Sequence, residues 1–116
     1  MKIIKIDDNF HTEEDPSGNK TWYQNDLIDR TGGPAVIYNS EDKYWYQNGL
    51  RHRLDGPAEE CSNGDKEWYQ NGKRHRLNGP AVEWCNGKKS WCYKGKEMEC
   101  SSQEEFERII KLRIFW

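Results

Sequence analysis

Two Arg-His-Arg triplets hold the residues of this sequence with the most potential for binding chemistry. They are Arg51-His52-Arg53 and Arg74-His75-Arg76, and we call them together the Arg-His strip. Such a strip could hold a phosphate group, an acidic loop or the backbone of an RNA. The alternative is that its side chains pair with nearby glutamates, which would neutralise the strip. These glutamates are Glu59, Glu60, Glu67 and Glu83.

An upstream segment, residues 28–30, shows which residues of the strip vary between repeats. Arg30 matches Arg53 and Arg76, but Ile28-Asp29 replaces the preceding Arg-His pair. An arginine present at all three positions points to a structural pairing, so the variable Arg-His pairs are the better candidates for recognition. Trp84 could add an aromatic anchor, since Trp and Arg are enriched among interface hot spots. The candidate partner-binding residues are Arg51, His52, Arg53, Arg74, His75, Arg76 and Trp84.

Motifs for catalysis or metal binding are not evident. The four cysteines, at positions 61, 85, 92 and 100, form no Cys-x-x-Cys pair, so we expect buried free thiols in a reducing compartment. There is no nucleophile motif and no phosphate-binding loop, and the carboxylates are scattered. The sequence therefore predicts a protein that is not an enzyme and has no cofactor and no metal.

The composition narrows the class of protein further. A length of 116 residues allows one domain, and a net charge of -2 gives no general reason to bind nucleic acid. No apolar run is long enough to span a membrane, and the charged N-terminus does not resemble a signal peptide, which predicts a cytoplasmic protein. Six Trp and six Tyr accompany few aliphatic residues, which favours a thin structure held together by aromatic side chains.

The chain repeats itself at a constant interval. Units begin at each of four evenly spaced tryptophans, Trp22, Trp45, Trp68 and Trp91, which we call the Trp row. Three complete units span residues 22–44, 45–67 and 68–90, a fourth decays over 91–100, and residues 16–21 match the end of a unit. A fixed period of this length indicates stacked supersecondary units.

Turn signals divide each unit into two short strands. Asn-Gly pairs occur at 48–49, 63–64, 71–72 and 86–87, and such a pair favours a type I′ hairpin turn with positive φ at both residues. Gly-Pro-Ala recurs at 33–35, 56–58 and 79–81, where proline belongs at a strand start or edge. Each unit is therefore predicted to be a β-hairpin.

Stacking such hairpins should align equivalent side chains in rows. The Trp row should lie on one face of the sheet, and a Tyr row on the other, because side chains alternate along a strand. The Tyr row comprises Tyr23, Tyr46 and Tyr69. We expect both rows to be structural; a stacking platform for bases or sugars is the alternative.

The two ends of the chain differ from the repeats. Ser102 and Glu105 form a capping-box pattern, and Phe106, Ile109, Ile110 and Ile114 recur at helical spacing. We expect this helix, with Leu112, Phe115 and Trp116, to cover the end or one face of the sheet, and residues 2–6 to form a strand that covers the other end. One domain, 1–116, would thus comprise a cap (1–15), hairpin repeats (16–100) and a helix (101–116).

The recurring Trp-Tyr-x-Asn-Gly with a downstream Gly-Pro-Ala resembles the MORN repeat, in the variant found in bacteria, bacteriophages and giant viruses. The resemblance covers residues 16–100. It implies a mainly β fold, an elongated single-layer antiparallel sheet of stacked β-hairpins, here with a C-terminal capping α-helix. Arrays of this kind mostly serve as scaffolds or binding surfaces; some have been linked to phospholipids, and bacterial variants to antitoxin-like roles.

Two functions are expected from this resemblance and from the residues. The first is a non-enzymatic protein-binding module, in its most concrete form a phage-encoded inhibitor of a host protein such as an antiviral immune effector in the host cytoplasm. The second is an anionic-ligand binder that takes a nucleotide, RNA or a phospholipid head group on the Arg-His strip.

Overall fold

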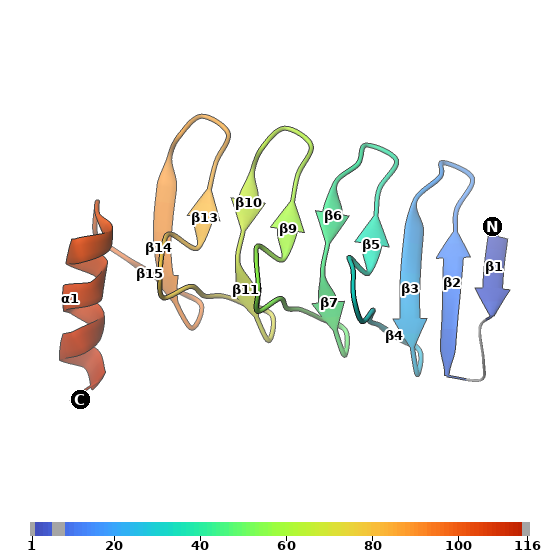
Figure 1. Ribbon diagram of the computed structural model, residues 1–116, viewed down its shortest axis with the longest axis horizontal. Coiled ribbons are helices and arrows are strands. Elements are labelled where there is room, and N and C mark those ends of the chain that lie inside the picture. The colour runs from blue at the N-terminus through green and yellow to red at the C-terminus, as the bar shows by residue number, and fades with distance from the viewer. Residues whose placement is uncertain (1, 6–8, 115–116) are drawn as a thin grey trace.

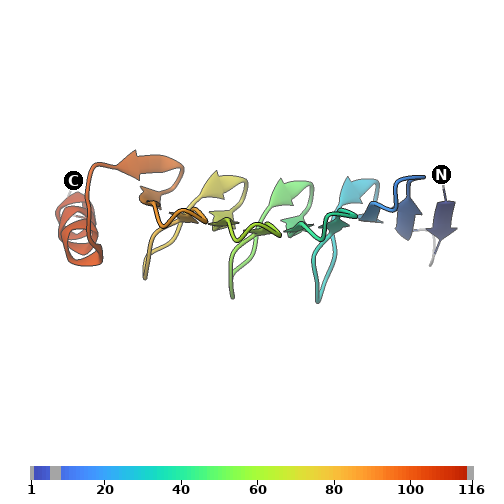
Figure 2. The same cartoon turned by 90° about the horizontal axis from the view of Figure 1, so that it is seen from above.

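Short β-hairpins lie side by side and build one long, thin sheet, with the helix at the end opposite the N-terminus (Figure 1). The computed structural model describes residues 2–5 and 9–114 and measures 49 × 32 × 18 Å. Seen from above, the hairpins form a single layer (Figure 2). The predicted fold class, a mainly β, elongated single-layer antiparallel sheet with a C-terminal helix, is confirmed.

The main sheet is antiparallel in the order β1-β2-β3-β5-β6-β9-β10-β13-β14-β15, with β4 paired to β3. Its strands are β1 (Lys2–Lys5), β2 (Phe10–Glu14), β3 (Lys20–Gln24), β4 (Leu27–Ile28), β5 (Val36–Ile37), β6 (Lys43–Tyr44), β9 (Glu59–Glu60), β10 (Lys66–Glu67), β13 (Val82–Glu83), β14 (Lys89–Tyr93) and β15 (Lys96–Met98). Two smaller pairs join β7 (Tyr46–Gln47) to β8 (Leu50–Arg51) and β11 (Tyr69–Gln70) to β12 (Lys73–Arg74). The sheet therefore grows one hairpin at a time along the chain.

Only one of the two Asn-Gly pairs in a unit forms the predicted type I′ turn. Asn48 and Gly49 have φ values of 51° and 79°, and the pair at 71–72 is equivalent. At the second pair only the glycine has positive φ, so the prediction of a type I′ turn there is wrong. The Gly64 N–H instead donates to the Cys61 carbonyl at 2.9 Å, and the Cys61 N–H donates to the Asp65 carbonyl at 2.9 Å. This is a three-residue loop that ends in a glycine bulge.

One unit places a side chain where this bulge needs glycine. Glu41 has a φ of 74°, whereas the equivalent positions hold Gly18, Gly64 and Gly87. Glu41→Gly is expected to raise the free energy of unfolding by about 1 kcal/mol, because relief of left-handed strain exceeds the added entropy of the unfolded chain. Urea unfolding would measure this change. Glu41→Ala removes the same side chain but keeps the strain, so equal stabilisation by both variants would contradict this explanation.

The repeated residues of each unit contact one another. The alanines of the Gly-Pro-Ala motifs are fully buried. Each of their carbonyls accepts a hydrogen bond from the backbone N–H of a tryptophan in the Trp row, at 2.7–2.8 Å. The three repeat arginines, Arg30, Arg53 and Arg76, place their guanidinium carbons 3.9–4.0 Å from the ring centroids of Trp22, Trp45 and Trp68. Each also donates to the proline carbonyl of its motif at 3.0–3.1 Å.

The motif glycine leaves room for the repeat arginine. A Cβ built on Gly79 would lie 2.6 Å from the guanidinium carbon of Arg76, and one on Gly56 would lie 2.8 Å from that of Arg53. Arginine is thus held between an indole face and bare backbone, where cation–π attraction adds to packing. The prediction that the repeat arginines make a structural pairing is confirmed, and these arginines cover one face of each of the first three rings.

Hydrogen bonds also tie each loop to the next. The side chains of Asn19, Asp42 and Asp65 accept from backbone N–H groups 20 residues further on, at 2.7–2.8 Å. These bonds hold the pKa of Asp42 and that of Asp65 below their ordinary value. The fourth equivalent residue is Lys88, which offers no acceptor. This series of bonds therefore stops where the repeats stop.

Helix α1 (Gln103–Ile114) closes the C-terminal end of the array. Ser102 Oγ accepts from the Glu105 N–H at 3.2 Å, as the capping box predicts, but the Glu105 carboxylate reaches the Ser101 N–H at 3.2 Å instead of that of Ser102. Phe106 is fully buried against Trp91 and Met98.

The predicted cap is thus confirmed for part of the helix. Ile109 and Ile110 pack against the same cluster as Phe106. Leu112 was expected to help cover the end and does not, because 61% of it is exposed on the outer side of the helix. The side chain of Ile114, and residues 115 and 116, lie outside the described residues.

The N-terminal end contains more hairpin than the sequence comparison indicates. β1 forms within residues 2–6 as predicted and pairs with β2, while residue 6 lies outside the described part. β2 then pairs with β3 across the loop at 15–19, so the first hairpin begins at Phe10 and not at position 16. The Gly-Pro-Ala motif is missing there, which hid this strand from comparison between units.

Candidate binding surfaces

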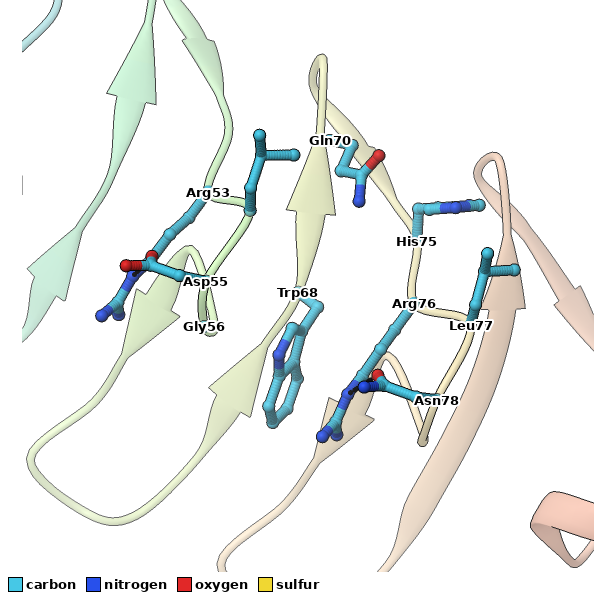
Figure 3. A pocket seen from close by; sticks show the side chains of 10 residues that line it. Arg53, Asp55, Gly56, Trp68, Gln70, His75, Arg76, Leu77 and Asn78 are labelled. Atoms are coloured by element: carbon cyan, nitrogen blue, oxygen red, sulfur yellow. Dashed lines mark hydrogen bonds and ion pairs between the residues drawn. The ribbon is translucent and has the colours of Figure 1, made fainter.

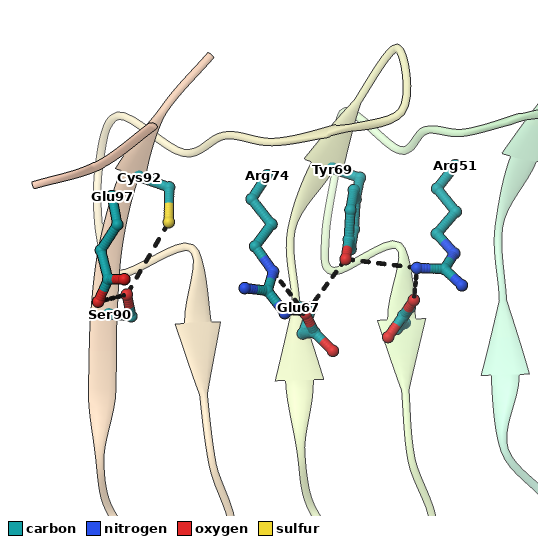
Figure 4. Close-up of polar contacts among 8 residues, drawn as sticks. Arg51, Glu67, Tyr69, Arg74, Ser90, Cys92 and Glu97 are labelled. Atoms are coloured by element: carbon teal, nitrogen blue, oxygen red, sulfur yellow. Dashed lines mark hydrogen bonds and ion pairs between the residues drawn. The ribbon is translucent and has the colours of Figure 1, made fainter. Parts of the chain in front are cut away.

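The structure does not bring the Arg-His strip together as one site. Successive residues of a strand alternate between faces, so the triplets divide. Arg53 and Arg76 lie with the Trp row, on the face that we call the Trp face. Arg51 and Arg74 lie with Tyr46 and Tyr69, on the Tyr face (Figure 4).

The arginines of the Tyr face are paired with glutamates. Arg51 Nη1 lies 2.6 Å from Glu59 Oε1, and Arg74 Nη2 lies 2.7 Å from Glu67 Oε1. Tyr69 links the two pairs, because its hydroxyl donates to Glu67 at 3.2 Å and accepts from Arg51 at 3.4 Å (Figure 4). The alternative in which glutamates neutralise the strip is therefore confirmed for these two arginines.

Arg53 is compensated in the same way on the Trp face. It lies 3.0 Å from Asp55 and 3.2 Å from Glu60. Arg76 differs because Asn78 replaces the aspartate, and it forms no ion pair within the described part of the chain. Burial lowers the pKa of Arg76. Of the four arginines in the strip, Arg76 is the one without an ion pair among the described residues, and only the more distant Glu83 offsets its charge.

Glu59 is a buried acid in an otherwise apolar position. Its equivalents in the neighbouring units are Val36 and Val82, and all three residues are buried. Burial and the adjacent carboxyl of Glu67 raise the pKa of Glu59 to about 7, and they outweigh the attraction of Arg51. Burial and Glu59 also raise the pKa of Tyr44 to about 12.

The raised pKa of Glu59 makes stability depend on pH. Between about pH 4.5 and 7 the folded chain holds a proton on Glu59 that the unfolded chain has lost, so the free energy of unfolding falls as pH rises. Outside this window the contribution is constant. Glu59→Gln is expected to flatten the dependence, measured by urea unfolding from pH 4 to 8. A Glu104→Gln control, on the exposed face of α1, should keep it; an unchanged slope in Glu59→Gln would contradict the assignment.

The two histidines of the strip tie units together. His52 Nδ1 accepts from the Asn71 N–H at 3.0 Å, and His75 Nδ1 accepts from the Lys94 N–H at 2.9 Å. Asp29 makes the same bond to the Asn48 N–H at 2.7 Å. Burial and Lys94 lower the pKa of His75, which keeps the imidazole neutral and able to accept.

These bonds give the histidines a structural role in the array, and their part in recognition stays a prediction. The sequence contains an indication of this role, because Asp29, His52 and His75 share one repeat position. What aspartate and histidine have in common there is a side-chain hydrogen-bond acceptor. The fourth equivalent is Met98, which lacks one and is buried against α1.

Trp84 lies apart from the strip. It follows β13 on the loop to β14, at the edge of the array opposite the turns that the histidines bind (Figure 1). The residue is 38% exposed. It remains a candidate anchor, but for a different surface.

Leucines on the Trp face are the feature that the sequence analysis missed. Leu54 is 76% exposed and Leu77 is 55% exposed, and both line an open groove of about 680 Å³ between two units. Trp68 lines the same groove, with Arg76 over one side of its ring (Figure 3). In the sequence, the two leucines share one repeat position, which lies in a polar segment directly after the repeat arginine.

The cysteines fall short of the expected burial. Cys92 is buried, Cys61 and Cys100 are half-buried, and Cys85 is exposed. Burial raises the pKa of Cys92, so its thiol stays protonated. Among residues 2–5 and 9–114, no three His, Cys, Asp or Glu side chains gather as a metal site.

Comparison of the chain with protein-family profiles, with curated proteins and with solved structures found no match in any of the three. Within the described residues, no helix has the length and apolar character needed to span a lipid bilayer.

Proposed function

We propose that this protein is a non-enzymatic binding module that recognises another protein through its Trp face. The observation that carries the proposal is the open groove between two units, flanked by two exposed leucines. Apolar side chains that are exposed together at a groove with a polar rim mark interaction sites, because a partner that covers them removes apolar surface from water.

The rest of the array supports this proposal. The repeated residues are engaged in holding the fold, and the Tyr-face arginines are paired with glutamates. A shallow, extended surface suits a protein partner better than a small molecule, which prefers an enclosed pocket. The resemblance to viral repeat arrays supports the specific form of the proposal, in which the partner is a host protein in the cytoplasm and binding inhibits or redirects it.

Affinity capture with paired variants tests the proposal. Leu54→Asp with Leu77→Asp is expected to lose the partner that the unchanged chain captures from host lysate, while Lys43→Asp with Lys66→Asp, at exposed positions on β6 and β10, keeps it. Circular dichroism would verify that both variants fold. Titration calorimetry with ATP, short RNA and phospholipid vesicles tests the alternative; micromolar affinity for one of them would overturn the protein-partner proposal.

A further inference from the structure

The last unit of the array shows how its Trp face binds a helix. Gln103, at the start of α1, connects two groups with its side-chain amide. Its Oε1 accepts from Trp91 Nε1 at 2.8 Å, and its Nε2 donates to the Leu77 carbonyl at 2.9 Å. One turn and two turns further along α1, Phe106 and Ile110 lie beside Leu77 in a second groove.

The same pair of groups is open one repeat earlier. Trp68 and Leu54 hold the positions in their units that Trp91 and Leu77 hold in the units that follow. In the described part of the chain, Trp68 Nε1 and the Leu54 carbonyl have no hydrogen-bond partner, and both residues line the open groove. This groove adjoins the groove beside α1, because Leu77 lines both.

One difference between the two positions defines the charge of the occupant. Phe106 covers Trp91, where the residue at the arginine position is Glu99. At Trp68 the corresponding place is taken by Arg76, which forms no ion pair in residues 2–5 and 9–114. A helix seated here would therefore meet a guanidinium where α1 places a phenyl ring.

From this repeat equivalence we infer that the Trp68 groove binds an acidic amphipathic α-helix of the partner protein. The helix carries Gln or Asn at one position, Asp or Glu three residues later and an aliphatic residue seven residues later. The amide connects Trp68 Nε1 with the Leu54 carbonyl, the carboxylate pairs with Arg76, and the aliphatic side chain covers Leu77. This inference rests on the proposed function and specifies the partner's binding element.

A peptide derived from α1 itself serves as the probe. It comprises residues 101–114 with Phe106→Glu, acetylated and amidated, which gives the required spacing at 103, 106 and 110. It is titrated into the full chain, and the indole N–H resonances are followed by NMR. We expect the Trp68 resonance to shift and that of Trp91 to stay, with Gln103→Ala in the peptide weakening binding about tenfold, as loss of a buried amide contact does.

Two further variants make the test specific. The peptide with native Phe106 should bind several-fold more weakly, because it lacks the carboxylate for Arg76. Trp68→Phe in the chain keeps the ring but removes the donor, and it should weaken binding about tenfold, whereas Trp84→Phe should not. Because the peptide variants leave the chain unchanged, the test stands even where a chain variant fails to fold.

Several results would overturn the inference. The first is that the Trp68 resonance does not shift at millimolar peptide. The second is a shift of the Trp91 resonance alone, which would mean that the peptide exchanges with the chain's own α1. The third is equal binding by the Gln103→Ala peptide. Concentration-dependent self-association of the chain that Leu54→Asp abolishes would overturn it too, since a second copy would then fill the groove. Failure of the peptide, with capture of the partner still lost in the double leucine variant, would refute the helix and leave the proposed function standing.

Discussion

Replacing Phe106 with alanine is expected to lower the free energy of unfolding by about 3–5 kcal/mol, the usual cost of removing a fully buried phenyl ring. Phe106 is fully buried and closes the cluster formed by Trp91 and Met98. Its loss would leave a cavity at the end of the array, where no further unit can fill it. Urea unfolding followed by circular dichroism would measure the effect.

Leu112 provides the matched control on the same helix. It is 61% exposed, so Leu112→Ala should change the free energy of unfolding by no more than about 0.5 kcal/mol. Deletion of residues 102–116 should act like Phe106→Ala and also promote aggregation, because it exposes the apolar end of the sheet. A soluble, monomeric and equally stable truncation would show that α1 is a free recognition element and no cap.

Replacing Trp68 with alanine is expected to cost about 3 kcal/mol or more, because the substitution removes a large aromatic ring and leaves Arg76 without its indole face. The loss affects units on both sides, since Trp68 stands in the middle of the array. Trp22→Ala should cost less, because the strand on its N-terminal side, β2, places Thr12 and no tryptophan opposite it. Thermal unfolding of both variants would test this order.

Trp84→Ala is the control for general effects of losing a tryptophan. Trp84 lies on a loop outside the Trp row and should change the thermal midpoint little. An unchanged midpoint in Trp68→Ala, or an equal loss in all three variants, would contradict the role assigned to the Trp row.

The repeat period and the turn chemistry were enough to predict the fold. Evenly spaced tryptophans defined the unit, and Asn48-Gly49 and its equivalent at 71–72 defined one of the two turns in each unit. The second Asn-Gly pair was misjudged because residue types do not reveal the loop length that converts a two-residue turn into a glycine bulge. Strand β2 was not predicted, because its segment lacks the Gly-Pro-Ala motif by which the units were compared.

The candidate surface was less predictable than the fold. Charged residues are easily identified in a sequence, but their partners are not. Arg51 and Arg74 pair with glutamates on neighbouring strands, and this pairing depends on the register of the sheet. The bonds of the histidines were hidden for the same reason, because the backbone N–H groups that donate to them lie 19 residues further along the chain. Leu54 and Leu77 were overlooked, since an isolated leucine in a polar segment shows its exposure only in the folded sheet.

Hydrogen–deuterium exchange of the chain, free and bound to its captured partner, tests the central claim most directly. If the Trp face binds the partner, exchange should slow at residues 54–56 and 77–79, the loops that carry the two exposed leucines, and stay unchanged at the opposite loops, 39–41 and 62–64. Slower exchange confined to the opposite loops, with residues 54–56 and 77–79 unchanged, would contradict the account and place the binding surface elsewhere on the array.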